Sequence, residues 1–350
     1  MPLFRKKASP PDLAQGIDSF WEWWAAAGAA RTAAAIASRA PEGMVDELSR
    51  RVNGIHPGLA WELAAGRSAQ HVLVVSPEGN PDLRGAARRW LRAAPESDGT
   101  WEYADARLAV PDLDDIRLSL GKQTVCFGDT VVTARRVGHH FDVVVHHPVF
   151  EEIPVEAQLQ ITYLALDAAL GEIDVETWVG EIEPAALAPL DAFPLRHLPR
   201  LVADLREELT DADGSPTWVM LQGSGPDGPV MAVAQVPLAP TAAPELDEHV
   251  AVAASYDHGT GEGLPGDEAL TALRALEDRL AGVLDGRGRL VAHESSGGRR
   301  TLHFYVDSAT GATRELLEAA QGWRHEDLAG VVETATESDP GWSAVRHLRA

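Results

Sequence analysis

The spacing of hydrophobic residues is clearest between residues 154 and 182, where it predicts a long buried helix followed by a strand. Apolar side chains recur three or four positions apart, and so share one face of a helix, at Val155, Leu159, Tyr163, Leu166 and Leu170. Pro154 suits the first turn of this helix, and Gly171 suits the position after its last turn. From Ile173 to Ile182 apolar and polar residues alternate, which is typical of a half-buried strand.

This helix and strand complete a longer β-α-β-β-α-β order that begins at Trp101. The hydrophobic pattern predicts strands over residues 101–109, 123–137, 141–147 and 173–182, with a short helix or turn over residues 112–120. Such an order folds naturally as a four-stranded antiparallel sheet with two helices on one face, the ferredoxin-like arrangement.

The last hundred residues repeat the same order. Strands are predicted over residues 249–255, 289–294, 300–306 and 325–333, and helices over residues 267–284 and 313–320. Residues 199–244 should connect the two parts through a helix, a hairpin and a stiff linker marked by Pro237, Pro240 and Pro244. We therefore predict an α+β protein with two ferredoxin-like (βαββαβ) antiparallel-sheet domains, residues 17–198 and 245–350.

The N-terminal region predicts a helical extension of the first domain. Residues 1–16 are expected to form a mobile leader, followed by helices over residues 20–40, 43–52 and 81–94 and a strand over residues 71–76. Aromatic residues cluster in the first helix at Phe20, Trp21, Trp23 and Trp24. Large indoles favour an anchor packed against the domain, and a docking face is the alternative. Near the C-terminus, sheet packing or a ligand groove is predicted for Tyr305, Trp323 and Trp342.

Length and composition agree with two globular domains in a reducing compartment. The chain has 350 residues, of which 45% are hydrophobic. It contains no apolar run of about 20 residues, so no membrane association is expected. Its basic N-terminus lacks the apolar stretch of a secretory signal, and Cys126 is the only cysteine. These features predict a cytoplasmic protein without a disulfide framework.

The charge balance narrows the expected partners. The net charge is −23, and the only lysines are Lys6, Lys7 and Lys122. A field of this sign repels phosphate backbones, so no nucleic-acid partner is expected, whereas a basic protein partner would be attracted. A solvated acidic surface is the alternative interpretation of the same charge.

A group of histidines between residues 139 and 147 is the sharpest local feature. On a strand, one face would carry His140, Asp142 and His146, a donor set that zinc or iron accepts. The chain lacks the H-x-x-x-H or paired-cysteine spacing of closed metal sites, so histidines at the surface or at a sheet edge are the alternative. No cofactor is expected.

A stripe of arginines lies on the predicted helix over residues 81–94. Arg84, Arg88 and Arg92 are four positions apart and would share one helix face. Such a stripe could bind a carboxylate-rich partner or an anion. A solvated helix face is the alternative.

The C-terminal third resembles the bacterial family known as domain of unknown function 695. The matching motifs are Gly263-Leu264-Pro265, Leu276-Glu277-Asp278, Arg299-Arg300, Phe304-Tyr305-Val306-Asp307 and Glu337-Ser338-Asp339-Pro340-Gly341-Trp342. The resemblance implies a ferredoxin-like fold without assigned activity. That family is distantly similar to the regulator B of ribonuclease E activity, a small acidic protein that inhibits a nuclease by binding it. Residues 17–198 resemble an uncharacterised bacterial module found beside it, with FWEWW near the start and LGE ending at Glu172.

These observations favour a non-enzymatic protein-binding or regulatory module. No G-x-S-x-G motif or nucleotide-binding loop ending in Gly-Lys-Ser/Thr occurs in the chain, and no catalytic residue is assigned. The alternative is a metal-dependent or acid/base hydrolase that uses the histidine-rich strand over residues 139–147.

Overall fold

The computed structural model shows an α+β protein and describes residues 13–40, 42–120, 123–212, 215–257, 260–323 and 328–349. The chain divides into two compact units, Met1–Arg107 and Leu108–Ala350. This division falls inside residues 17–198, which the sequence analysis assigned to one domain. Of the expected leader, residues 1–12 lie outside the described part, and residues 13–16 form the first turn of a helix.

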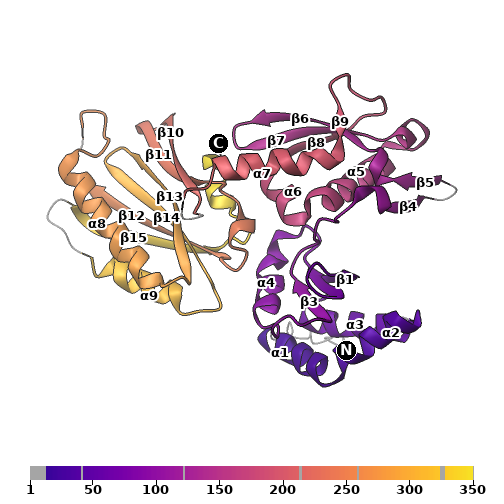
Figure 1. Cartoon of the computed structure of the whole chain (residues 1–350). Coiled ribbons are helices and arrows are strands. Elements are labelled where there is room, and N and C mark those ends of the chain that lie inside the picture. Colours follow the sequence, from indigo (N-terminus) through magenta and orange to yellow (C-terminus); the bar gives the residue numbers. More distant parts are fainter. Residues whose placement is uncertain are drawn as a thin grey trace, which may run out of the picture. The chain divides into compact units, whose positions relative to one another are not determined.

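The first unit packs its helices on a small mixed sheet (Figure 1). Its helices are α1 (Leu13–Trp23), α2 (Ala29–Ser38), α3 (Glu42–Ile55) and α4 (Arg84–Arg92), with a short π-helix over Trp24–Gly28 between α1 and α2. Its strands are β1 (Ala60–Ala65), β2 (His71–Ser76) and β3 (Trp101–Ala104). The strand order is β1-β2-β3, in which β2 is antiparallel to β1 and parallel to β3. Strand β1 was not predicted.

An aromatic core holds the first unit together. Trp24, Trp90 and Trp101 are buried almost completely, and Trp21 stacks on Trp90 with ring centroids 4.8 Å apart. The indole N–H of Trp21 donates to the carbonyl of Trp90 at 2.9 Å, which satisfies its polar end. The prediction that the tryptophan cluster is a packing anchor is therefore confirmed.

The second unit begins with a four-stranded sheet of order β8-β7-β6-β9. Its elements, with a separate hairpin of β4 and β5, are β4 (Arg117–Leu120), β5 (Gln123–Cys126), β6 (Val131–Val137), β7 (His140–His146), α5 (Val155–Leu170), α6 (Glu172–Trp178), β8 (Val179–Pro184), β9 (Phe193–Pro194) and α7 (Leu198–Glu208). Because β3 pairs with β2 in the first unit, the first predicted βαββαβ arrangement does not form.

Residues 173–178 are helical, so the strand predicted over Ile173–Ile182 is wrong in its first half. Gly171 has a φ of 83°, which ends α5 and lets the chain begin α6 at once. Val175 and Trp178 are three residues apart, and both are buried on one side of α6. An alternating pattern of this length also fits a short helix with a buried i, i+3 pair.

The C-terminal part of the second unit is a six-stranded antiparallel sheet of order β10-β11-β13-β14-β12-β15. Its elements are β10 (Thr217–Gly225), β11 (Gly228–Val236), β12 (Glu248–Tyr256), α8 (Asp267–Leu284), β13 (Gly288–Ser296), β14 (Arg299–Val306), α9 (Ala312–Gln321) and β15 (Leu328–Ser338). The predicted hairpin of the connecting segment thus extends this sheet. The start of the last predicted strand, residues 325–327, lies outside the described residues.

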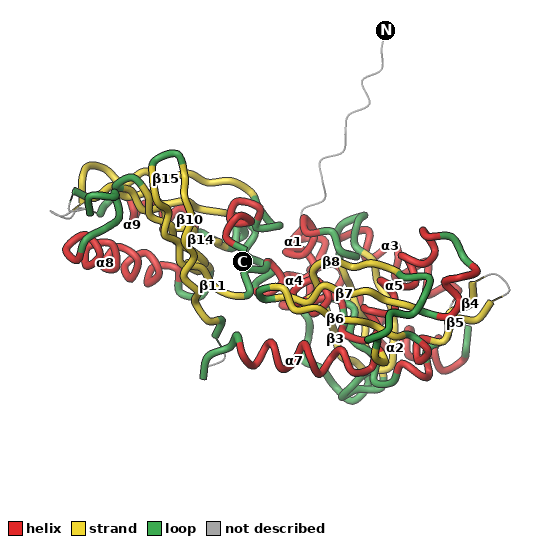
Figure 2. Tube along the Cα trace, turned by 90° about the horizontal axis from the view of Figure 1, so that it is seen from above, coloured by secondary structure: helices red, strands yellow, loops and turns green. Residues whose placement is uncertain are grey.

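The two faces of this sheet are covered differently. Helices α8 and α9 pack on one face, where Val250, Leu302 and Phe304 are fully buried (Figures 1 and 2). On the opposite face, Tyr305 stacks on Trp342 with centroids 4.4 Å apart, beneath the C-terminal 3₁₀ helix Ser343–Leu348. Burial of Tyr305 and Trp342 confirms the sheet packing predicted for them.

Candidate functional site

The histidine-rich strand does not gather its three predicted metal ligands. His140 Nε2 lies 3.3 Å from Asp142 Oδ1, whereas His146 is buried and its Nδ1 lies 2.9 Å from the carbonyl oxygen of Ala185. Four residues along a strand separate Asp142 from His146 by about 13 Å. Within the described residues, no group of three or more His, Cys, Asp or Glu side chains is placed to hold a metal ion.

The arginine stripe on α4 is not a uniform surface. Arg84 is buried in the first unit with 3% of its surface exposed, so it cannot reach a partner. Arg88 forms an ion pair with Asp105, with Nε and Oδ2 2.9 Å apart. Arg92 is exposed. Of the three arginines predicted to bind a partner, Arg84 is therefore buried within the first unit and Arg88 is paired within it.

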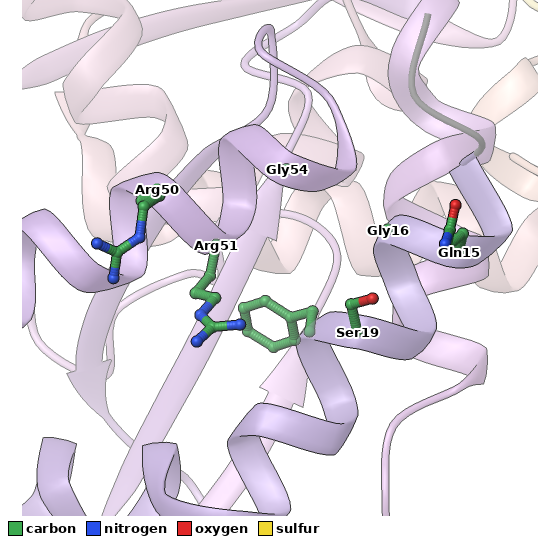
Figure 3. Close-up of a pocket in the computed structure, with 7 residues that line it drawn as sticks. Gln15, Gly16, Ser19, Arg50, Arg51 and Gly54 are labelled. Atoms are coloured by element: carbon green, nitrogen blue, oxygen red, sulfur yellow. The ribbon is translucent and has the colours of Figure 1, made fainter.

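A cavity of about 470 Å³ lies between α1 and α3 in the first unit. Its walls carry Gln15 and Ser19 from α1 and Arg50 and Arg51 from α3, and Arg50 points away from the α1 side chains (Figure 3). Both arginines pair with Glu47, Arg51 with Nε and Oε1 2.9 Å apart. Together the two arginines and Glu47 carry one net positive charge, and both arginines already pair with that glutamate.

Strand β10 is one edge of the six-stranded sheet and exposes large apolar side chains. Trp218 and Met220 are 44% and 63% exposed. The register aligns Met220 with Val233 of β11, His293 of β13 and Leu302 of β14, so this surface continues the face that α8 and α9 cover farther along. An exposed tryptophan and methionine at an unpaired strand edge are the usual features of a docking surface.

Alternation of the backbone defines which groups of β10 face outward. A two-residue turn, Pro226-Asp227, joins β10 to β11, so Gly225 and Gly228 on either side of it exchange backbone hydrogen bonds. In an antiparallel ladder every second residue bonds to the same neighbour. Val219, Leu221 and Gly223 therefore direct their N–H and C=O groups towards β11, and those of Trp218, Met220 and Gln222 point away from it. Within the described residues β10 pairs with β11 alone in its sheet.

A buried chain of histidines and carboxylates crosses the sheet on the face opposite α8 and α9. His249 Nδ1 lies 3.3 Å from Glu337 Oε1, and His249 Nε2 lies 3.1 Å from His303 Nδ1. His303 Nε2 lies 3.2 Å from Glu294 Oε1, and His347 Nε2 lies 3.3 Å from Glu294 Oε2. Four strands and the C-terminal 3₁₀ helix thus contribute one side chain each. We call these five residues the histidine–glutamate chain.

The interior of the histidine–glutamate chain is buried and its ends reach solvent. The side chains of His249 and His303 are 6% and 7% exposed, whereas Glu337 and His347 are 63% and 55% exposed. Burial lowers the pKa of His249, reinforced by His303 and opposed by Glu337. The hydrogen bond from His303 lowers the pKa of Glu294, so this carboxylate is ionised at neutral pH.

A second cavity, of about 320 Å³, opens where the chain ends at Glu294 and His347. Its remaining walls come from β10, β11 and the C-terminal 3₁₀ helix, at Leu221, Gln222, Gly223, Ser224, Val230, Ala232 and Leu348. The cavity is therefore lined by one ionised carboxylate, one imidazole and several apolar side chains. It is large enough for a small organic molecule.

Comparisons with known proteins identify no relative of this chain. No protein-family model matches the chain, and neither the curated proteins nor the solved structures include a significant match. The resemblance of residues 245–350 to the domain of unknown function 695 family therefore stays a prediction. Within the described part of the chain, no helix is both long and apolar enough to cross a membrane.

Proposed function

We propose that this protein is a non-enzymatic binding module that docks an extended segment of a partner protein along β10. The observation that carries the proposal is the combination, in one edge strand, of outward-facing backbone groups at Trp218, Met220 and Gln222 with the exposed side chains of Trp218 and Met220. Strand addition uses such an edge, because main-chain hydrogen bonds give affinity and alternate side chains give specificity.

The charge of the protein indicates the chemistry of the partner segment. A net charge of −23 attracts basic chains and speeds their encounter with the protein. A segment that alternates apolar with basic side chains would place its apolar side chains beside Trp218 and Met220. The preferred partner is therefore an extended, basic protein segment in the cytoplasm, a location supported by the single cysteine, Cys126.

The proposal includes a ferredoxin-like fold for residues 248–338. Its support is the β-α-β-β-α-β order of β12, α8, β13, β14, α9 and β15, with antiparallel neighbours in the order β13-β14-β12-β15. The hairpin of β10 and β11 then extends this arrangement at β13. The proposed docking edge would be an addition to the basic fold.

The test is a titration of the full chain with a peptide of four Val-Lys repeats. Amide chemical shifts and tryptophan fluorescence monitor the titration. We expect saturable shifts at the outward-facing amides of Trp218, Met220 and Gln222. Gln222→Pro removes an outward N–H and should weaken binding at least tenfold, because proline cannot donate to an added strand.

Two controls make the titration decisive. Gln222→Ala changes an exposed side chain on β10 and keeps every backbone donor, so it should bind as the wild type does. A peptide of four Val-Asp repeats should not bind, because its charge matches that of the protein. Equal binding of both peptides, or shifts confined to other strands, would refute the proposed docking edge.

A further inference from the structure

The hydrogen bonds of the histidine–glutamate chain require one more proton than neutral imidazoles and ionised carboxylates supply. Three contacts join Glu337, His249, His303 and Glu294, and each needs one hydrogen between its two heavy atoms. Two neutral imidazoles supply two protons, and ionised carboxylates supply none. All three hydrogen bonds can therefore form only when one imidazole of the pair carries a second proton. His347 brings its own proton to Glu294, so it does not alter this count.

The charged groups around the two histidines place that extra proton between carboxylates. Glu337 of β15 and Asp339 after it face His249, and Tyr305 of β14 contacts its ring. Glu294 of β13 and His347 of the 3₁₀ helix face His303, and His293 lies near it in β13. With the proton present, one positive charge lies between the carboxylates of Glu337 and Glu294.

The second cavity gives a ligand access to one end of this arrangement. Glu294 lines the cavity, and each of its oxygens accepts from one histidine, which leaves a further lone pair on each. Val230, Ala232 and Leu348 provide apolar walls for a short hydrocarbon chain. An ammonium group would find a carboxylate in a protein whose net charge of −23 already concentrates cations.

We propose that this cavity binds a small primary ammonium compound at Glu294, and that binding expels the extra proton from the His249–His303 pair. A cation at Glu294 repels the imidazolium charge and replaces it as the partner of the carboxylate. The proton leaves His249 Nδ1 for the exposed carboxylate of Glu337 and then water, so both imidazoles become neutral. The cavity shares β10 with the proposed docking edge, but Glu294 lies on the sheet face opposite Trp218 and Met220.

The test is calorimetry of the full chain with n-butylammonium chloride in two buffers that differ in ionisation enthalpy. We expect saturable binding at pH 5 with release of up to one proton for each ligand. The affinity should rise several-fold from pH 5 to pH 7, because binding at the lower pH must expel the proton and binding at the higher pH meets neutral imidazoles. Butyrate, which has the same chain and a negative charge, should not bind.

Two variants distinguish the contact between the ligand and Glu294 from the release of the proton by the histidine pair. Glu294→Gln should lower the affinity at least tenfold, and His303→Gln should retain binding and abolish proton release. Glu333→Gln, an exposed carboxylate of β15 outside the histidine–glutamate chain, should match the wild type. The proposal fails if butyrate binds instead of butylammonium, or if the wild type binds butylammonium without proton release. The wild-type measurement decides this point even if a variant does not fold.

Discussion

The two faces of the six-stranded sheet show how one set of strands can serve two purposes. The face beneath α8 and α9 buries mainly apolar side chains, among them Val252, Leu302 and Phe304. The opposite face buries His249 and His303 almost as deeply, in contact with carboxylates. The first face supplies hydrophobic stabilisation, whereas the second keeps titratable groups in a defined geometry that packing alone does not require.

Polar groups on the helix-covered face are paired in a different way. Arg300 is buried there, and its guanidinium donates to Ser295 Oγ at 2.9 Å and to Glu277 Oε1 at 3.0 Å. The arginine of this pair keeps its charge throughout the physiological pH range. On the opposite face the bridging groups are histidines, a side chain that can gain or lose a proton under conditions in which arginine stays charged. The difference places the linked chain of histidines and carboxylates on the face without α8 and α9.

The largest expected effect comes from breaking the apolar face. Phe304→Ala removes a fully buried ring from the cluster beneath α8 and α9, and should lower the free energy of unfolding by about 3–5 kcal/mol. Urea denaturation followed by far-UV circular dichroism measures this change. Phe304→Leu serves as the matched control, because it keeps most of the apolar volume and should lose much less. Similar losses in both variants would contradict an apolar origin of the stability.

The apolar face shows where sequence patterns succeed. Leucines spaced three or four apart between Asp267 and Gly286 predicted a helix over residues 267–284, and α8 has these bounds. The strand over residues 71–76 was predicted with equal accuracy. In these segments the local pattern and the tertiary environment agree, so the pattern suffices.

The polar face shows where sequence patterns fail. His249 and Glu337 are separated by 88 residues, and they meet only because β12 and β15 are neighbours in the sheet. Local spacing carries no information about that pairing, whereas it drew attention to the adjacent histidines of residues 139–147. A usable signal was His303, a polar residue inside the apolar run from Leu302 to Val306. Such a residue must find a partner when its strand is buried.

An intermediate effect is expected from a histidine on the helix-covered face. Burial, together with Arg300 and His303, lowers the pKa of His293 from its usual 6.5 to about 4. Protonation is therefore easier in the unfolded chain. The contribution of His293 to stability is complete above pH 6.5 and is lost as the pH falls towards 4, by about 3 kcal/mol in total.

The variant His293→Leu tests this contribution, because leucine does not titrate. Urea denaturation at pH 7 and pH 4.5 should show a smaller loss of stability on acidification in the variant than in the wild type. His56→Leu in the first unit is the control for loss of a histidine elsewhere. If His293→Leu loses as much stability in acid as the wild type, His293 is not the buried neutral group that its surroundings imply.

The smallest effect is expected next to Phe304, at Tyr305, whose side chain points to the opposite face. Its hydroxyl donates to Asp339 Oδ2 at 2.6 Å, and burial together with this carboxylate raises the pKa of Tyr305. Tyr305→Phe removes one hydrogen bond and keeps the ring that stacks on Trp342. Asp339 still accepts from the backbone N–H groups of Ser343 and Ala344. The free energy of unfolding should therefore fall by only about 1–2 kcal/mol.

The same urea denaturation measures this difference. The result sharpens the comparison of the two faces, because Phe304 and Tyr305 are adjacent in sequence and both are fully buried. A loss as large as that of Phe304→Ala would mean that the hydrogen bond holds the C-terminal 3₁₀ helix in place. The polar face would then supply as much stability as the apolar face.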